Sequence, residues 1–311
     1  MARRLVSRGV ERRLNQNDPV LRQRSVESTG KGIAACDHTP GDPSAVTSAW
    51  ERAEAEPLET RCYGDSGLPV VVVHGGPGAA GYMAPVARRL AGEYQVIEPL
   101  QRCSSSEPLT VRRHVDDLRR VIEIHCRGRR PALVGHSWGA MLVLAFAASC
   151  PGFASSIALV GCGTFDARSR TVLEQTIRDR MTPAVRERLK EASRRIRDPD
   201  VRLCVVARIL EPLYSCELVP HEDETAFYDS QGQRETWSDM LRLQRAGTYP
   251  AAFAGIREPL LMLHGDLDPH PGSLIRDALL PFVPHLEYVG LPRCGHYPWL
   301  ERHACEAFFG M

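Results

Sequence analysis

The pentapeptide GHSWG at 135–139 constrains the fold of this chain more than any other segment. It follows an apolar, strand-like segment at 131–134 and precedes an Ala- and Leu-rich segment at 140–148 that is typical of a helix. A serine between a strand and a helix can occupy a sharp, strained turn that raises its hydroxyl above the sheet, and flanking glycines leave room for the neighbouring backbone. We therefore predict that Ser137 is a nucleophile, the alternative being a Gly-rich turn without catalytic function.

Two downstream motifs supply the partners that a serine nucleophile needs. HGDLD at 264–268 and CGHYP at 294–298 each follow a strand-like segment. Because a free serine is too weakly acidic to attack unaided, we assign His296 as general base and Asp268 as the group that orients the imidazole and stabilises its charged form. Asp266 is the competing acid; Asp268 is preferred because it lies further beyond the strand, whereas Asp266 can cap the turn.

A third motif, HGGPG at 74–78, follows the valine run at 70–73. Negative charge that develops on a substrate oxygen is best stabilised by preorganised backbone N–H groups. We predict that Trp138, directly after the nucleophile, supplies one donor and Gly76 the other, since Pro77 has no N–H. The lysine of a P-loop and the glycine spacing of a dinucleotide-binding fold are both missing from this motif, so no nucleotide cofactor is expected.

Strand-like and helix-like segments alternate along most of the chain. Helices are predicted at 82–90, 111–126, 140–148 and 273–280, and strands at 58–63, 70–73, 94–97, 131–134, 157–160, 260–263 and 286–289. Continuous valines indicate a strand buried on both faces. The predicted fold is therefore α/β, with a mostly parallel sheet covered by helices on both faces and ligands at the carboxyl ends of the strands.

Two segments depart from this alternation. Residues 1–57 are Arg-rich without periodicity and are predicted to be a disordered basic leader. Residues 164–256 are rich in Arg and Glu and are predicted to form an inserted helical cap, with helices at 171–180, 183–197, 201–210 and 235–244. The α/β core is then expected to consist of 58–163 and 257–311.

Composition excludes several classes of partner. A formal net charge of +1 argues against nucleic acid or acidic membranes as partners. The longest apolar runs fall far short of the roughly 20 residues that a membrane helix requires. Ten cysteines without a C-x-x-C pair indicate neither a zinc site nor a redox motif, and they fit a reducing cytoplasm. We expect no metal, no cofactor, and only a small-molecule or short-peptide substrate.

From about residue 68 to 309 the chain resembles the α/β-hydrolase superfamily, which carries serine, acid and histidine in this chain order. The combination of HGGPG and GHSWG is similar to the prolyl aminopeptidase (proline iminopeptidase) branch, and this implies cleavage of a small amino-terminal residue from peptides. That branch has a segment resembling Asp-Gln-Arg-Gly-x-Gly-x-Ser after the next strand. Here Gln101 and Arg102 are present, whereas Cys103 and a run of serines replace the glycines, which leaves the exact substrate open.

The resemblance also implies acidic cap residues that bind the free amine of the substrate. Glu211, Glu217 and Trp237 are taken as substrate-binding residues. Further candidates are Glu222, Asp223, Glu224 and Tyr228. The Trp-rich segment ending in Glu that often accompanies such acids in that branch is missing from this sequence, which favours a solvated position in the cap for each acid over a role in amine binding.

Taken together, the motifs predict a serine hydrolase that cleaves a small ester or amide through an acyl-enzyme, in one form a prolyl aminopeptidase-like peptidase. A carboxylesterase or C–C hydrolase of the same fold is the alternative within enzymes. An alternative of another class is a non-catalytic small-molecule-binding protein, because folds of this kind are reused for binding.

Overall fold

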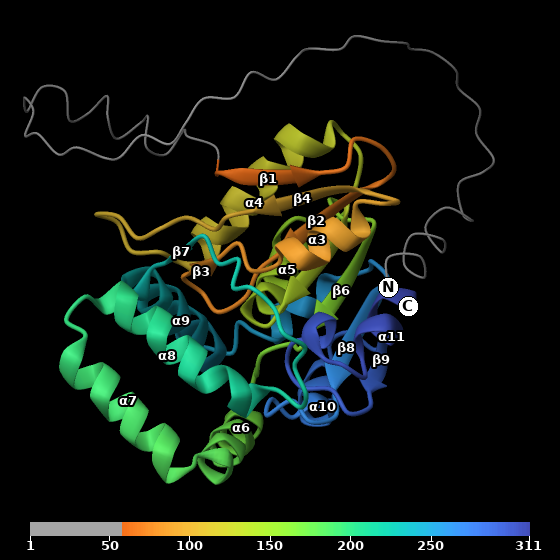
Figure 1. Ribbon diagram of the computed structural model, residues 1–311. Helices are drawn as coiled ribbons and strands as arrows, with labels where there is room; N and C mark the ends of the chain where they lie inside the picture. Colours follow the sequence, from red (N-terminus) through yellow and green to blue (C-terminus); the bar gives the residue numbers. More distant parts are fainter. Residues whose placement is uncertain (1–57) are drawn as a thin grey trace, which may run out of the picture.

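The computed structural model describes residues 58–311, so the predicted leader at 1–57 lies outside the described residues. The central sheet contains β1 (Thr60–Tyr63), β2 (Pro69–Val73), β4 (Gln95–Pro99), β5 (Ala132–His136), β6 (Ser156–Val160), β8 (Leu260–Gly265) and β9 (Leu286–Leu291). Its seven strands lie in the order β1-β4-β2-β5-β6-β8-β9 (Figure 1). β1 is antiparallel to β4 and every other neighbouring pair is parallel, which confirms the mostly parallel α/β fold.

Helices cover both faces of this sheet, as predicted. Val71 and Val73 pack in one apolar cluster with α4 (Val111–Cys126), α5 (Trp138–Ser149) and α10 (Gly272–Leu279). Val70 and Val72 pack on the opposite side with α3 (Ala84–Leu90) and α11 (Cys305–Gly310). Successive side chains of a strand point to opposite faces, so an unbroken valine run fits a strand buried on both.

The helix that follows the serine motif lies deep in the core. All residues of α5 from Trp138 to Ala147 are buried, and the helix has no polar face. A helix that is apolar all round needs protein on every side. Because α5 begins directly after Ser137, the serine is attached to one of the most completely packed elements of the fold.

The segment after β6 is helical and lies to one side of the sheet (Figure 1). It contains α6 (Ala167–Arg180), α7 (Pro183–Arg195), α8 (Pro199–Tyr214), α9 (Ser230–Arg245) and a short 3-10 helix, η2 (Ala251–Gly255). Three of these helices begin before their predicted starts because Asp166, Asp198 and Asp229 cap them, each accepting a backbone N–H of the first turn. None of the helices in residues 58–311 is long and apolar enough to cross a membrane.

A two-stranded sheet that was not predicted joins this segment to the core. β3 (Ala79–Ala80) pairs antiparallel with β7 (Phe227–Tyr228). The pairing is extended by the N–H of Asp229, which donates to the carbonyl oxygen of Gly78 at 2.7 Å. The loop after β2 is therefore tied to the chain between α8 and α9.

A second 3-10 helix, η3 (Pro298–Leu300), follows the last strand.

Candidate active site

Ser137 occupies the strained turn that the sequence predicts. Its φ of 56° and ψ of −118° lie outside the broadly allowed regions, and its N–H donates to the carbonyl oxygen of Val160 at 2.9 Å. A Cβ on Gly135 would lie 2.3 Å from the oxygen of Gly139, and one on Gly139 would lie 2.2 Å from the oxygen of Val73. Only glycine fits at either position, so the two flanking glycines allow the elbow to form.

His296 and Asp268 meet at the carboxyl ends of β9 and β8. Nδ1 of His296 lies 2.6 Å from Oδ2 of Asp268, and both side chains are buried. Burial lowers the pKa of His296, which keeps its imidazole neutral and able to accept a proton. Asp266 faces elsewhere: its Oδ1 accepts the N–H of Cys294 at 3.2 Å, so it caps the turn. The structure thus places Asp268, not Asp266, against the histidine.

Asp268 is surrounded by two further histidines. Its Oδ1 accepts the N–H of His270 at 2.9 Å and lies 3.0 Å from Nδ1 of the same residue. Nε2 of His264 lies 3.3 Å from Oδ2. Burial by itself would raise the pKa of Asp268, but electrostatic interactions with the imidazoles of His296, His270 and His264, and the hydrogen bond with His270, hold it well below its usual value. The carboxylate is therefore ionised. His270 was missed by sequence reasoning, although its position two residues after Asp268 was a signal.

A chain of hydrogen bonds connects the HGGPG loop, the elbow and the loop of His296. The N–H of Gly75 donates to the hydroxyl of Tyr82 at 2.6 Å, and that hydroxyl lies 2.6 Å from Nδ1 of His136. Nε2 of His136 lies 2.9 Å from the carbonyl oxygen of His296. Since the carbonyl can only accept, His136 donates from Nε2 and accepts from Tyr82 at Nδ1. Tyr82 was predicted only as part of a helix.

The two residues expected to supply oxyanion donors both border the candidate pocket. Gly76 and Trp138 line the same pocket as Ser137. Of the HGGPG loop, Gly76 and Pro77 line the pocket, and Pro77 has no N–H, so Gly76 is the candidate donor beside the serine.

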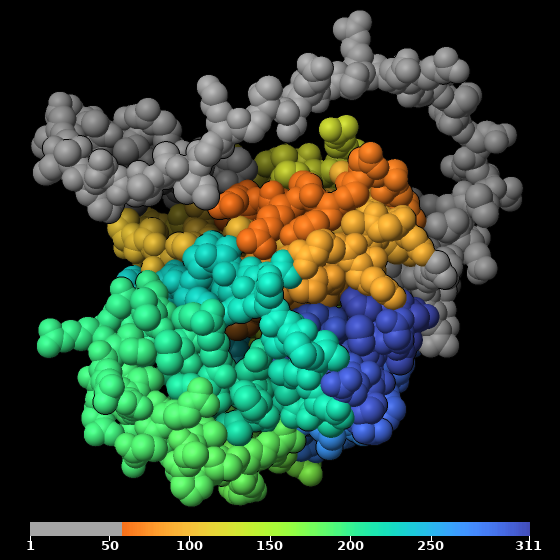
Figure 2. Space-filling view, in the orientation of Figure 1, coloured from red at the N-terminus to blue at the C-terminus, as the bar shows by residue number. Residues whose placement is uncertain are grey.

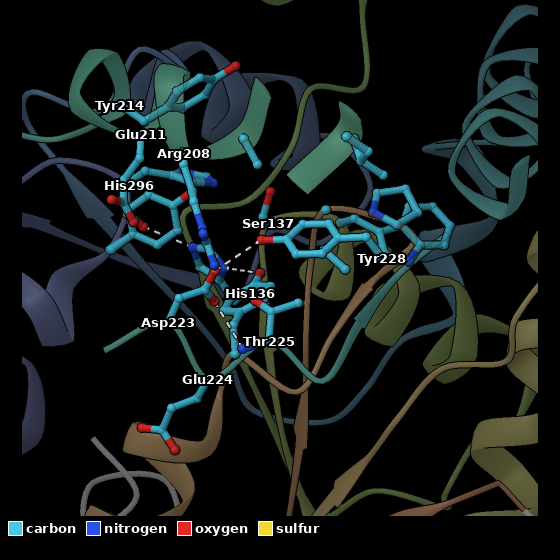
Figure 3. Close-up of a pocket in the computed structure, with 18 of the residues that line it drawn as sticks. His136, Ser137, Arg208, Glu211, Tyr214, Asp223, Glu224, Thr225, Tyr228 and His296 are labelled. Carbon is cyan, nitrogen blue, oxygen red and sulfur yellow. Dashed lines mark hydrogen bonds and ion pairs between the residues drawn. The ribbon is translucent and has the colours of Figure 1, made fainter. Parts of the chain in front are cut away.

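The pocket above Ser137 has a volume of about 780 Å³ (Figure 3). Its lining includes His296, Met141 and Trp138 from the core, together with Tyr214 and other residues of the segment between β6 and β8. In the space-filling view a hollow is visible among the teal atoms of that segment (Figure 2). A serine, a histidine and apolar walls in one concave site fit the features of an enzyme pocket.

Most of the described chain matches a known protein family. Residues 70–309 match the model of the alpha/beta hydrolase family. The chain belongs to this family. Among curated protein sequences, none matches the chain.

Solved structures of similar fold include several hydrolases. A thermophilic esterase from Thermogutta terrifontis is 21% identical, with 81% of this chain and 90% of that one covered at a TM-score of 0.55. A serine hydrolase involved in carbazole degradation is 16% identical (81% and 92% covered, TM-score 0.56). Est816, an N-acyl homoserine lactone degrading enzyme, is 18% identical (82% and 96%, TM-score 0.51). At these identities the likeness shows the fold alone, so the prolyl aminopeptidase-like branch stays a prediction.

Gln101 and Arg102 anchor the loop in which Cys103 and serines stand in place of the glycines that the resemblance implies. The Gln101 amide donates to the carbonyl oxygen of His74 at 2.7 Å and accepts the indole N–H of Trp138 at 2.9 Å. Arg102 forms an ion pair with Asp117 at 2.6 Å. The loop is thus held against both the HGGPG loop and the first residue of α5.

The predicted substrate-binding residues divide into two groups. Glu211 and Trp237 line the hydrolase pocket, and so do Glu222, Asp223, Glu224 and Tyr228. Glu217 does not: it is exposed outside the pocket, where its carboxylate lies 2.5 Å from Arg302 and 2.9 Å from His303. The expectation that Glu217 contacts substrate is therefore corrected, because these partners on the surface satisfy its charge.

The acids that do line the pocket differ in their partners. Asp223 pairs with Arg208 at 3.1 Å, and Glu224 pairs with Arg88. Glu211 lies 3.4 Å from Nε2 of His221, and among the described residues no arginine pairs with it. Glu211, which is half-buried, and Glu222, which is exposed, are thus the acids of the pocket that no arginine of the described residues pairs with.

Proposed function

We propose that this protein is a serine hydrolase that cleaves a small ester or amide through an acyl-enzyme intermediate. The observation that carries the proposal is the placement of Ser137. It sits at a strained elbow and opens into the same pocket as His296, whose Nδ1 lies 2.6 Å from the buried Asp268. Strained backbone of this kind costs about 1–3 kcal/mol and persists where function needs it.

The geometry supports a two-step mechanism. His296 accepts the Ser137 proton at Nε2, because its Nδ1 faces Asp268, while the serine oxygen attacks the carbonyl carbon. Backbone N–H groups of Gly76 and Trp138 stabilise the negative oxygen. His296 then protonates the leaving group, and a water that it deprotonates releases the acid and restores Ser137.

A second candidate is a prolyl aminopeptidase-like peptidase, and one observation favours it. Glu211 lies in the pocket without an arginine partner, so its carboxylate can bind the free amine of a short peptide. We also propose that the substrate is a small molecule or a short peptide and that residues 164–256 form a helical cap. The proposed location is the cytoplasm.

Two chromogenic substrates, p-nitrophenyl acetate and proline p-nitroanilide, test the proposal together. We expect Ser137→Ala to lower the rate of product release by about 10⁴-fold or more while the circular dichroism spectrum is unchanged, because loss of the nucleophile removes the acyl-enzyme route. Full activity in Ser137→Ala would refute the mechanism. A folded parent protein that does not react with an organophosphonate probe at Ser137 would instead favour the non-catalytic binding protein.

The same assay separates the two substrate classes. Serine-dependent release from the anilide, lost in Glu211→Gln, would establish an aminopeptidase. Release from the ester alone, unaffected by Glu211→Gln, would establish an esterase whose cap does not bind an amine.

A further inference from the structure

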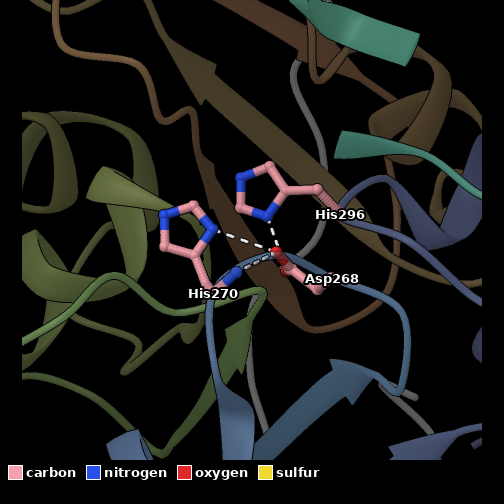
Figure 4. A group of neighbouring side chains, drawn as sticks. All are labelled: Asp268, His270 and His296. Atoms are coloured by element: carbon pink, nitrogen blue, oxygen red, sulfur yellow. Dashed lines mark hydrogen bonds and ion pairs between the residues drawn. The ribbon is translucent and has the colours of Figure 1, made fainter. Parts of the chain in front are cut away.

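Asp268 carries a second imidazole in addition to that of His296. Nδ1 of His270 lies 3.0 Å from Oδ1, while Nδ1 of His296 lies 2.6 Å from Oδ2 (Figure 4). The two rings stack with their centroids 4.6 Å apart and their planes inclined by 19°. The dyad of acid and histidine that a serine hydrolase requires explains only one of these rings, so the second needs its own account.

The three side chains offer a set of donor atoms that fits a transition-metal ion. One nitrogen from each ring and one carboxylate oxygen all lie within 4.8 Å of one another. Tetrahedral zinc, with bonds of about 2.0–2.1 Å, needs ligand atoms about 3.4 Å apart, a spacing between the 2.6 Å that separates Nδ1 of His296 from Asp268 and the 4.8 Å within which all three donors lie. Imidazole nitrogens with a carboxylate suit Zn²⁺, Cu²⁺ or Ni²⁺, whereas Ca²⁺ and Mg²⁺ prefer oxygen alone.

The surroundings also suit a bound ion. His270 and His296 line the pocket, which gives an ion a route from solvent, while the Asp268 side chain is fully buried. His264 steadies the site from behind: its Nε2 donates to the carbonyl oxygen of His270 at 2.9 Å and lies 3.3 Å from Asp268. Outer contacts of this kind orient the ligands of metal sites.

We propose that Asp268, His270 and His296 form an inhibitory site for a divalent transition-metal ion, represented by Zn²⁺. Its inhibitory effect rests on the proposed hydrolase function, whereas the binding itself does not.

Inhibition follows from the position of protons on the rings. An ion at Nδ1 of His296 displaces the proton that this nitrogen shares with Asp268, and the neutral ring then carries its single proton on Nε2. A protonated Nε2 cannot accept the proton of Ser137. The ion also draws the Asp268 carboxylate into its own coordination shell. The metal-bound protein is therefore inactive until a chelator removes the ion.

Titration calorimetry with ZnCl₂ tests the site directly, on protein first stripped with EDTA. We expect Zn²⁺ to bind in the parent protein and in Ser137→Ala, which keeps all three ligands. His270→Gln should weaken binding at least about 100-fold, because loss of an outer contact alone costs 10–100-fold. His221→Gln, another histidine of the pocket, is the matched control and should bind like the parent. Exposed thiols at Cys62, Cys103 and Cys216 contribute equally to every variant.

Hydrolysis assays report the consequence of binding. We expect Zn²⁺ to abolish turnover in the parent, EDTA to restore it, and Ca²⁺ or Mg²⁺ at the same concentration to have no effect. In His270→Gln, zinc should inhibit only at about 100-fold higher concentration, relative to that variant's own rate. Equal zinc affinity in His270→Gln and the parent would overturn the inference, as would loss of binding in His221→Gln. A protein that binds zinc at this site but hydrolyses nothing would retain the site and refute only the proposed function.

Discussion

Removal of the Tyr82 hydroxyl is a sensitive test of how the HGGPG loop is held. In Tyr82→Phe the N–H of Gly75 and Nδ1 of His136 both lose their partner, and both residues are buried. Each unpaired buried polar group costs about 1–3 kcal/mol, so the free energy of unfolding should fall by about 2–6 kcal/mol. Because Tyr82 lines the pocket, water can reach the two groups, and we expect a loss near 2 kcal/mol.

The matched control is Tyr228→Phe in the same pocket. The Tyr228 hydroxyl lies 3.4 Å from Asp223 and is hydrogen-bonded to the Thr225 side chain, and neither partner is buried, so its removal should change stability by no more than about 0.5 kcal/mol. Urea denaturation followed by circular dichroism measures both variants. The turnover number of Tyr82→Phe should also fall about tenfold, less than the 10²–10³-fold cost of losing an oxyanion donor outright, because Tyr82 only positions the loop. Equal urea midpoints for the two variants would refute this reasoning.

Two further substitutions probe packing and charge. Gly139→Ala places a methyl group 2.2 Å from the backbone oxygen of Val73 and should destabilise the fold by about 3 kcal/mol or more, whereas Gly92→Ala, with open space around it, should be nearly neutral in the same urea assay. Burial raises the pKa of Glu98 to about 7 from 4.5, so the fold favours its protonated form and stability should fall as pH rises from about 4.5 to 7. Glu98→Gln should remove that part of the pH dependence of the unfolding free energy, and an unchanged difference between pH 5 and pH 8 would contradict it.

Local patterns with a strict backbone requirement could be predicted from the sequence. The glycines around Ser137 are needed because of backbone oxygens a little over 2 Å from any Cβ, and that requirement is visible as a motif. The valine run predicted a strand buried on both faces because successive side chains of a strand point to opposite faces. The motif order also placed Asp268 and His296 after neighbouring parallel strands, which brings them to one edge of the sheet.

Contacts between distant segments could not be predicted in this way. The Tyr82 hydroxyl is hydrogen-bonded to His136, 54 positions away, and no sequence pattern near Tyr82 predicts this contact. Glu217 and Glu211 are both acids of the predicted cap, and the sequence does not distinguish them. Only the folded chain shows that Glu217 pairs with Arg302 and His303 on the surface. The true starts of α6, α8 and α9 could have been predicted, since an aspartate before a helical segment is a common cap. The predicted starts were too late because apolar periodicity begins several residues after the cap.

The short pairing of β3 with β7 has a consequence for how a substrate enters. Hydrogen bonds from Ala226 to Ala80 and from Asp229 to Gly78, both 2.7 Å, join the chain over the pocket to the loop that carries Gly76. If the chain from 215 to 229 lifts to admit a substrate, it must either break these bonds or pull the loop with it. Entry of a substrate and the position of the loop that carries Gly76 are therefore mechanically linked. A displacement of residues 215–229 that keeps these bonds also shifts the loop that carries Gly76 relative to Ser137.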